Sequence, residues 1–366
     1  MKVVVVDDHT SVDGPEYRII KKIKAYAERN TNVYYLRTPQ NKLKAGALNT
    51  GISFVMKMKE RPSVVITSDD DVQINKDTLV EMVKSLHATD KMGAVCTQAR
   101  VKNRKTNILT RLQALEYHSF TVSKIADHGF LSGPLVMQGM LTAFRAKALS
   151  GVKGYKVGHL IEDYEITVRL KKKGWDVGIA KKAVAWTKVP ENFSALWRQR
   201  VRWGYGGLQV VLEHGRAVYA VFQDLLGHSL FLLLFSLIVA SFLIKKSYTA
   251  SPYLLFAVIL VAVLQFVASL IYNAISLLTY EEKDRYDVLV RVSVLPEFVY
   301  SNLLSLVLIG SYFYLAYNRI VGRFADKTKF INKMYKSGLK IFNKFGYSST
   351  WGTRFEYTKE RGVINS

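Results

Sequence analysis

Three consecutive carboxylates, at positions 69–71, follow a mostly apolar run at residues 64–67, with only Ser68 between them. Two unit charges about 4 Å apart repel by roughly 4 kcal/mol at an effective dielectric near 20, so the triplet needs full solvation or a nearby positive charge. Carboxylate oxygens bind hard divalent cations such as Mg²⁺ and Mn²⁺, which also bridge phosphate oxygens. The triplet is therefore either a solvated acidic turn or a site for a nucleotide diphosphate and its metal.

A second acidic pair, Glu162 and Asp163, opens a segment with the pattern of a short helix. Ile166 and Leu170 are four residues apart, and Gly174 is the predicted stop. Carboxylates in a first turn are favoured by the helix dipole, which also keeps an aspartate ionised and able to accept a proton. The pair is either a catalytic base with its neighbour or plain N-terminal capping.

A third group, Gln199, Arg202 and Trp203, is spaced so that an amide, a guanidinium and an indole share one helical face. Arginine can bind phosphate oxygens bidentately, and tryptophan offers a flat surface for a sugar ring or a base. Alternatively, the segment is a basic amphipathic helix on anionic lipid, with Arg198 and Arg200 on its other faces. One helix could serve both purposes.

Apolar runs alternate with amphipathic segments through the first hundred residues. Strands are predicted at residues 3–6, 32–36, 64–67 and 93–97, with helices after 13–15, at 45–56 and after an Asp77 cap. This alternation predicts an α/β fold with a mainly parallel sheet. Ligands bind beyond the carboxyl ends of such strands, where Asp7, Asp8, Asp69 and Asp71 all fall.

The distribution of apolar residues decides how the basic composition is interpreted. The 366-residue chain has a formal net charge of +23, which favours polyanionic partners. Residues 225–244 and 253–278 are each apolar and long enough to cross a hydrocarbon core, which needs about 20 residues. Residues 292–317 form a third candidate, which Pro296 and Glu297 make partly interfacial or re-entrant. A membrane is therefore expected as a partner, and nucleic acid is not.

The tail from residue 319 is rich in lysine and poor in acids, so the positive-inside rule predicts that it is cytoplasmic. If the catalytic region is also cytoplasmic, the number of spans must be even, whereas the sequence offers two or three. Cys96 is the only cysteine, so an intrachain disulfide and a cysteine-based metal site are excluded. Its setting is that of a small buried strand residue.

Six segments in chain order carry a resemblance to a known family. They are VVDDHTSVD (5–13), KAGALNTGI (44–52), SDDD (68–71), GMLTAFRAKAL (139–149), IEDYEIT (161–167) and QRVRW (199–203). Together they resemble the inverting family 2 glycosyltransferases, in the membrane-embedded branch of cellulose, chitin and hyaluronan synthases. The resemblance implies a GT-A (Rossmann-like) catalytic domain at 1–217, a transmembrane region at 218–318 and a basic, cytoplasmic tail at 319–366.

On the donor side, the resemblance implies roles for the matched positions. Asp7 and Asp8 would contact the nucleotide base, and Lys44 would lie on the nucleotide side. Asp69 and Asp71 would meet a diphosphate-bound Mg²⁺ or Mn²⁺ ion.

On the acceptor side, Asp163 would be the general base, with Glu162 beside it. The family resemblance assigns the diphosphate and the acceptor sugar to the remaining motif, Gln199, Arg202 and Trp203.

The implied activity is sugar transfer from a UDP-sugar to a growing polysaccharide or glycan acceptor, at the plasma membrane with a cytoplasmic catalytic domain. A transferase adding one sugar to a lipid acceptor and an inactive, truncated membrane subunit are the alternatives. The chain also departs from the family pattern. The strand and helix that normally precede the VVDD strand are expected to be missing, Ile161 replaces a threonine, and no clear gating-loop motif follows the spans. Residues 351–362 are similar to the tryptophan-plus-basic tail of some members.

Overall fold

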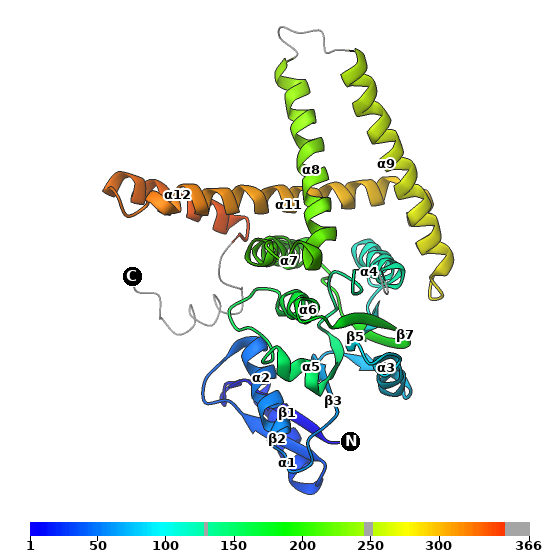
Figure 1. The fold of residues 1–366 in the computed structure, drawn as a ribbon, viewed down its shortest axis with the longest axis vertical. Coiled ribbons are helices and arrows are strands. Elements are labelled where there is room, and N and C mark those ends of the chain that lie inside the picture. Colours follow the sequence, from blue (N-terminus) through cyan, green and yellow to red (C-terminus); the bar gives the residue numbers. More distant parts are fainter. Residues whose placement is uncertain (128–130, 245–251, 348–366) are drawn as a thin grey trace. The chain divides into compact units, whose positions relative to one another are not determined.

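The structure is a computed structural model that describes residues 1–127, 131–244 and 252–347. The chain forms two compact units, shown in Figure 1: the first comprises residues 1–98 and 128–185, and the second residues 99–127 and 186–366. The tail segment 351–362, for which a family likeness is expected, lies outside the described residues.

The elements up to residue 187 alternate between strands and helices. The strands are β1 (Val3–Asp7), β2 (Val33–Arg37), β3 (Val64–Ser68), β4 (Gln73–Ile74), β5 (Met92–Val101), β6 (Leu141–Arg145) and β7 (Asp176–Thr187). The helices of the first unit are α1 (Tyr17–Arg29), α2 (Leu43–Met56), α3 (Thr78–Leu86), α5 (Ala146–Gly151) and α6 (Glu162–Lys172). The predicted α/β class and the four predicted strands are confirmed, with β4, β6 and β7 in addition.

The sheet strands show how the acidic turn is positioned. β1 pairs with β2 in parallel, while a five-stranded sheet has the order β3-β6-β5-β7-β4. β6 is antiparallel to both β3 and β5, so these two run in the same direction. Because Ser68 at the end of β3 pairs with Leu141 at the start of β6, the residues just before β6 meet the acidic turn.

The core of the first unit confirms one prediction and corrects another. Cys96 is fully buried in β5, as its apolar setting indicates. Asp77 precedes α3, but its side chain makes no capping hydrogen bond, so the predicted cap is wrong. The Thr78 hydroxyl instead accepts from the Asn75 N–H at 3.0 Å and donates to the Val184 carbonyl at 2.9 Å, which satisfies the polar groups at this turn.

The second unit is mainly helical. Its helices are α4 (Ile108–Ala126), α7 (Phe193–His214), α8 (Val218–Ile244), α9 (Pro252–Thr279), α10 (Arg285–Val292), α11 (Leu295–Ile320) and α12 (Lys329–Lys344). A short 3-10 turn (Gly322–Phe324) separates α11 from α12. Pro296 lies in the first turn of α11, where a missing N–H costs nothing, so it does not break the helix.

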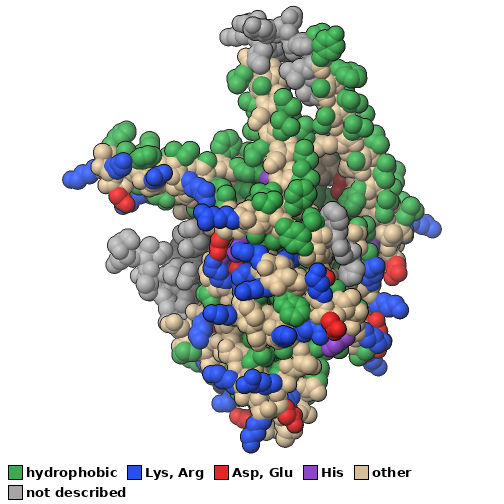
Figure 2. Space-filling model, viewed as in Figure 1, with side chains coloured by type: hydrophobic (Ala, Val, Ile, Leu, Met, Phe, Trp, Pro, Cys, Tyr) green, Lys and Arg blue, Asp and Glu red, His purple; other side chains and the backbone are tan. Residues whose placement is uncertain are grey.

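Three helical segments are long and apolar enough to cross a membrane: Val218–Ser241, Leu255–Thr279 and Leu295–Phe324. Hydrophobic side chains cover the visible surfaces of α8 and α9 in Figure 2. α8 and α9 extend in roughly the same direction, whereas α11 runs across them (Figure 1). All three apolar segments predicted from the sequence are thus helices, but the third has a different direction.

A buried charge pair joins three helices of the second unit. The Arg200 guanidinium donates to both carboxylate oxygens of Glu116, at 2.8 and 2.6 Å, and the Tyr300 hydroxyl donates to the same carboxylate at 2.6 Å. Arg200 is only 5% exposed. The interpretation of Arg200 as a lipid-facing residue is therefore wrong, because its charge is neutralised inside the helical packing; Arg198 is exposed.

Candidate active site

Lys44 is the positive charge beside the acidic turn. Its ammonium lies 2.7 Å from Asp69 Oδ1 and 3.1 Å from Glu162 Oε1, so one cation bridges the end of β3 and the start of α6. Asp70 and Asp71 are exposed. The repulsion within the triplet is thus relieved in both of the expected ways: the first carboxylate is paired with Lys44, and the next two are exposed to solvent.

Asp163 is held by two backbone donors. The Gly139 N–H donates to Oδ2 at 3.0 Å, and the Tyr164 N–H donates to Oδ1 at 2.8 Å. A Cβ on Gly139 would lie 2.9 Å from the Asp163 Cβ, closer than such atoms approach. The close backbone approach that fixes this carboxylate therefore requires glycine at position 139.

The β3–β6 pairing explains why these segments meet. The Asp69 N–H donates to the Met140 carbonyl at 2.9 Å, which extends the ladder by one step beyond β3. The Gly139 carbonyl accepts a long hydrogen bond, 3.5 Å, from the Lys44 ammonium. Asp69, Lys44 and Asp163 are consequently joined through the backbone of two adjacent residues, Gly139 and Met140.

The electrostatics of this cluster make Asp163 a good proton acceptor. Burial raises the pKa of Asp163 and the Glu162 carboxylate raises it further, while Lys44 opposes both. Burial also raises the pKa of Asp69 to about 6, again with Lys44 opposing the rise. Burial alone would lower the pKa of Lys44, but the three surrounding carboxylates raise it. Lys44 therefore stays charged while Asp163 keeps a high proton affinity.

Asp7 is enclosed by the protein. Its carboxylate accepts hydrogen bonds from the Tyr35 hydroxyl at 2.7 Å, the Arg37 guanidinium at 2.7 Å and the Thr10 N–H at 2.8 Å. Burial would raise the pKa of Asp7, but the hydrogen bonds from Thr10 and Tyr35 and the charge of Arg37 lower it. In this arrangement Asp7 fixes the loop after β1, and its predicted contact with a base stays a prediction.

Asp8 is more accessible than Asp7. It accepts from the Lys42 N–H at 2.8 Å and from the Thr38 hydroxyl at 2.9 Å, and it remains partly exposed. Its predicted base contact also stays a prediction.

Asn49 is a site-building residue that the sequence reasoning missed. Its side chain donates to the Tyr155 carbonyl at 2.7 Å and accepts from the Tyr155 N–H at 2.8 Å. The Tyr155 hydroxyl lies 3.0 Å from the Thr67 hydroxyl on β3. These bonds fix α2, and with it Lys44, against β3. The KAGALNTGI segment that carries Lys44 also contains Asn49, so this segment was the available signal.

Gln199, Arg202 and Trp203 lie on α7 in the second unit. The Trp203 ring packs against Tyr117, with centroids 6.3 Å apart, and the Arg200 guanidinium lies 4.3 Å from its centroid. Gln199 Oε1 is buried and accepts no hydrogen bond within the described part of the chain. The structure thus brings Lys44, Asp69, Glu162 and Asp163 together in the first unit, and groups the α7 residues separately in the second.

The carboxylates of Asp69 and Asp71 suit a hard cation whose other ligands come from a bound substrate. No group of three or more His, Cys, Asp or Glu side chains suitable for a metal occurs among the residues that the structure describes. Asp69 and Asp71 can therefore supply only part of a coordination shell. Mg²⁺ is commonly held through one or two carboxylates together with substrate phosphates, and this set fits that pattern.

Comparisons with known proteins identify a family and curated relatives. Residues 63–280 match the family described as Glycosyl transferase family group 2. Poly-beta-1,6-N-acetyl-D-glucosamine synthases of Staphylococcus aureus (strain COL) and Staphylococcus epidermidis are each 29% identical over 213 residues, covering 58% of this chain and 48% of theirs. The chain therefore spans about half the length of these curated relatives.

Two solved structures show weaker likeness. A mannosyltransferase, PcManGT from Pyrobaculum calidifontis in complex with GDP-Man and Mn²⁺, has a TM-score of 0.48 and 16% identity, covering 85% of this chain and 76% of that one. GalNAc-T7 with UDP, GalNAc and Mn²⁺ has a TM-score of 0.40 and 13% identity, covering 57% and 41%.

Proposed function

Because this chain belongs to glycosyl transferase family group 2, we propose that it transfers a sugar from a UDP-sugar to a growing polysaccharide or glycan acceptor, with inversion. The observation that carries the proposal is the Lys44 ammonium between Asp69 and Glu162, beside the backbone-held Asp163. Charged groups from three distant segments meet there at the carboxyl end of β3. Such an edge is where α/β folds bind ligands.

Asp163 is the proposed general base. It takes the proton of the acceptor hydroxyl while the acceptor oxygen forms a bond to the anomeric carbon. The bond from that carbon to the diphosphate breaks, and its electron pair leaves with the diphosphate. One displacement inverts the anomeric centre. The Gly139 and Tyr164 N–H groups hold the carboxylate in place throughout.

The donor diphosphate is assigned to the side of the carboxylate cluster that carries Lys44. A bound Mg²⁺ or Mn²⁺ ion, held by Asp69 and Asp71, would supply stabilisation of the negative charge on the leaving diphosphate. Lys44 adds a fixed positive charge near the same oxygens.

The family motifs suggest which residues bind the rest of the donor and the acceptor. Asp7 and Asp8 are proposed for the base. For the diphosphate and the acceptor sugar, the proposed group on α7 consists of Gln199, Arg202 and Trp203.

We place the enzyme in the plasma membrane, with catalytic residues 1–217 and the basic tail 319–366 in the cytoplasm and residues 218–318 as a membrane region of two or three spans. The three apolar helices support membrane embedding. The named relatives support a polysaccharide product, so UDP-N-acetylglucosamine is the first donor to test. A transferase adding one sugar to a lipid acceptor remains the second candidate within this family, and an inactive truncated subunit is the non-enzymatic one.

The test is UDP release by the purified full chain with a panel of UDP-sugars and Mn²⁺. Asp163→Asn should slow release by roughly 10²- to 10⁴-fold, because the proton acceptor is lost. The matched control is Glu81→Gln, which removes a half-buried carboxylate of α3 that pairs with the exposed Lys84 at 2.7 Å and should leave the rate unchanged. Release by Asp163→Asn at the parental rate, or no release with any donor, would contradict the proposal. A product ladder separates polymerisation from single addition.

A further inference from the structure

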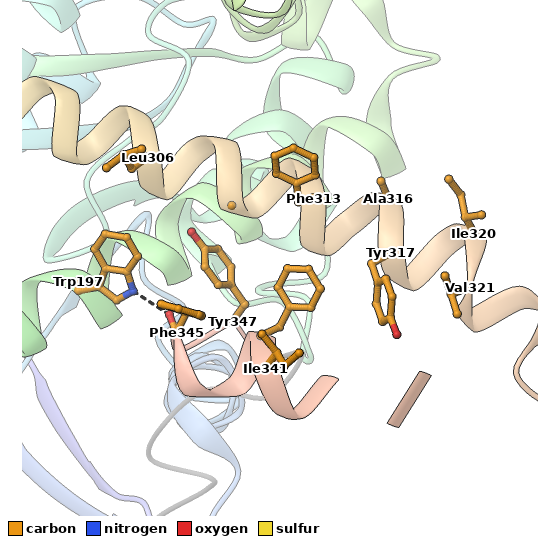
Figure 3. A pocket seen from close by; sticks show the side chains of 12 residues that line it. Trp197, Leu306, Phe313, Ala316, Tyr317, Ile320, Val321, Ile341, Phe345 and Tyr347 are labelled. Atoms are coloured by element: carbon orange, nitrogen blue, oxygen red, sulfur yellow. Dashed lines mark hydrogen bonds between the residues drawn. The ribbon is translucent and has the colours of Figure 1, made fainter. Parts of the chain in front are cut away.

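An apolar groove lies between α11 and α12, closed at one end by Trp197 of α7 (Figure 3). Its volume is about 580 Å³. The side chains that line it are apolar or aromatic and include Leu306, Phe313, Ile341, Phe342 and Phe345.

The polar atoms at this groove are already satisfied by the protein. The Trp197 indole N–H donates to the Phe345 carbonyl at 2.7 Å (Figure 3). The Tyr347 hydroxyl donates to the Val307 carbonyl at 2.8 Å. The Tyr317 hydroxyl donates to the Met334 carbonyl at 2.8 Å, and the other side chains of the lining are hydrocarbon. A ligand here gains by burying apolar surface and finds few hydrogen-bond partners.

The opposite face of α12 is strongly basic. Four lysines recur at helical spacing along one side and line a second hollow of about 550 Å³: Lys329, Lys333, Lys336 and Lys340. We call this set the lysine row. Asp326 is the one acidic residue of that hollow. Lys and Arg side chains are visible along α12 in Figure 2. Phe330, in the first turn of α12, and Phe345, directly after its last residue, are 77% and 58% exposed.

The direction of α11 relates this helix pair to a bilayer. Tyr312 of α11 packs on Phe231 of α8, with ring centroids 6.2 Å apart, and hydrogen-bonds to His228. At that contact α11 runs across the direction of α8 and α9 (Figure 1). If α8 and α9 cross the membrane, α11 and α12 lie along its surface. A helix there places its apolar face toward acyl chains and its lysines toward headgroups.

We propose that α12 lies among anionic phospholipids of one leaflet, with an acyl chain in the α11–α12 groove and headgroup phosphates at the lysine row. The charge of the row selects an anionic headgroup, because lysines at a membrane surface are attracted to anionic lipids. The apolar groove selects a lipid over a free phosphate ion, which could use the lysines but not the groove. This inference depends on the proposed membrane embedding and is independent of the sugar-transfer chemistry.

Trp197 provides a direct probe. The full chain in neutral detergent is titrated with phosphatidylglycerol or phosphatidylcholine carrying brominated acyl chains, which quench nearby indoles. The chain has five tryptophans, so the Trp197 signal is the difference between the parent and Trp197→Phe. We expect brominated phosphatidylglycerol to quench this signal at a concentration at least about tenfold lower than brominated phosphatidylcholine.

Charge variants test the lysine row. Replacing its four lysines with glutamine should abolish the preference for phosphatidylglycerol while quenching at saturation persists. The control replaces four exposed lysines of the first unit, Lys22, Lys24, Lys57 and Lys59, and should keep the preference. Native mass spectrometry of retained phosphatidylglycerol in the parent and both variants gives the same comparison without Trp197→Phe.

Four results would overturn the assignment. If both lipids quench equally, the site does not select an anionic headgroup. If the preference for phosphatidylglycerol survives loss of the lysine row, those lysines do not provide the selection. Displacement by inorganic phosphate at matched ionic strength makes the row a free-phosphate site. Quenching that occurs only after deletion of residues 348–366 means that the chain's own tail fills the groove. Loss of UDP release alone would bear on the proposed catalytic function and leave lipid binding intact.

Discussion

Lys44 is a single cation among three carboxylates, and its effect on Asp163 can be measured. Burial and Glu162 raise the pKa of Asp163, while the Lys44 charge restrains the rise. A general base works only when deprotonated, so the pKa of Asp163 sets where activity falls on the acid side. Lys44 therefore extends activity toward lower pH.

Lys44→Met should move the acid limb of the kcat/KM profile to higher pH. The variant removes the charge that lowers the pKa of Asp163, so a higher pH is needed to ionise the base. The measurement is kcat/KM for UDP release across the pH range. Lys42→Met, which changes a lysine whose backbone N–H rather than its ammonium contacts Asp8, is the control and should keep the parental limb. A limb that stays in place or moves to lower pH in Lys44→Met would refute the assignment of Asp163 as the base.

Gly139→Ala should lower kcat by roughly 10- to 100-fold with a much smaller change in the donor KM. Its new Cβ would displace the Asp163 side chain, and a shift of about 1 Å at a reacting group can cost 10²-fold. Steady-state kinetics checks this. Gly151→Ala is the control, because a Cβ there meets nothing within 4 Å and should leave kcat unchanged. Equal kcat values for the two variants would show that the contact does not hold the base.

The residues with diagnostic chemistry were predictable, but the contacts that position them were not. Lys44, Asp69, Glu162 and Asp163 stand in recognisable segments, and the structure brings them together. Gly139 lies in a recognised segment too, yet its contact with Asp163 depends on the register of β6 against β3, which local pattern does not encode. The enclosure of Asp7 likewise depends on partners from β2.

At the scale of elements, the sequence predicted the strands and helices that have continuous apolar runs. It did not predict those in which polar residues interrupt the apolar pattern. β7 carries Lys181 and Lys182 in its middle, which interrupts its apolar pattern. α4 buries Gln113, His118 and Thr121, residues that a sequence pattern places at the surface. Their burial depends on surrounding tertiary structure, as with the His118 ring nitrogen that lies 3.0 Å from the Thr279 hydroxyl of α9.

Glu116→Gln should destabilise the second unit by roughly 3–5 kcal/mol. It leaves the Arg200 charge buried between helices without its carboxylate, and such unpaired buried charges are costly. Thermal unfolding of the full chain measures the effect. Glu81→Gln breaks a pair whose lysine is 67% exposed and should cost at most about 0.5 kcal/mol. Similar losses of stability from both variants would show that the buried Glu116–Arg200 pair stabilises the protein no more than the Glu81–Lys84 pair does.

At the scale of the whole molecule, the arrangement of the helices bears on the number of spans. The sequence alone left the number of membrane spans open at two or three. α8 and α9 share a direction that α11 crosses, which favours two spans and agrees with a catalytic region and a basic tail on the same side.

A cysteine-labelling experiment in intact cells tests this topology. Cys96 is the only native cysteine, so Cys96→Ala provides the background. Ser247→Cys, in the sequence between α8 and α9, should react with a membrane-impermeant maleimide from outside. Ser337→Cys on α12 is exposed on the protein surface and should react only after permeabilisation. Labelling of Ser337→Cys in intact cells would instead indicate three spans.

The pairing of β6 with β3 also bears on the order of events during biosynthesis. The Lys44 cluster cannot exist until the strand that follows Gly139 and the helix that carries Asp163 have both left the ribosome, so it forms late within the first unit. Every residue of that cluster nevertheless precedes Val218, where the first long apolar helix begins. The Lys44 cluster can therefore assemble in water before α8 has been synthesised.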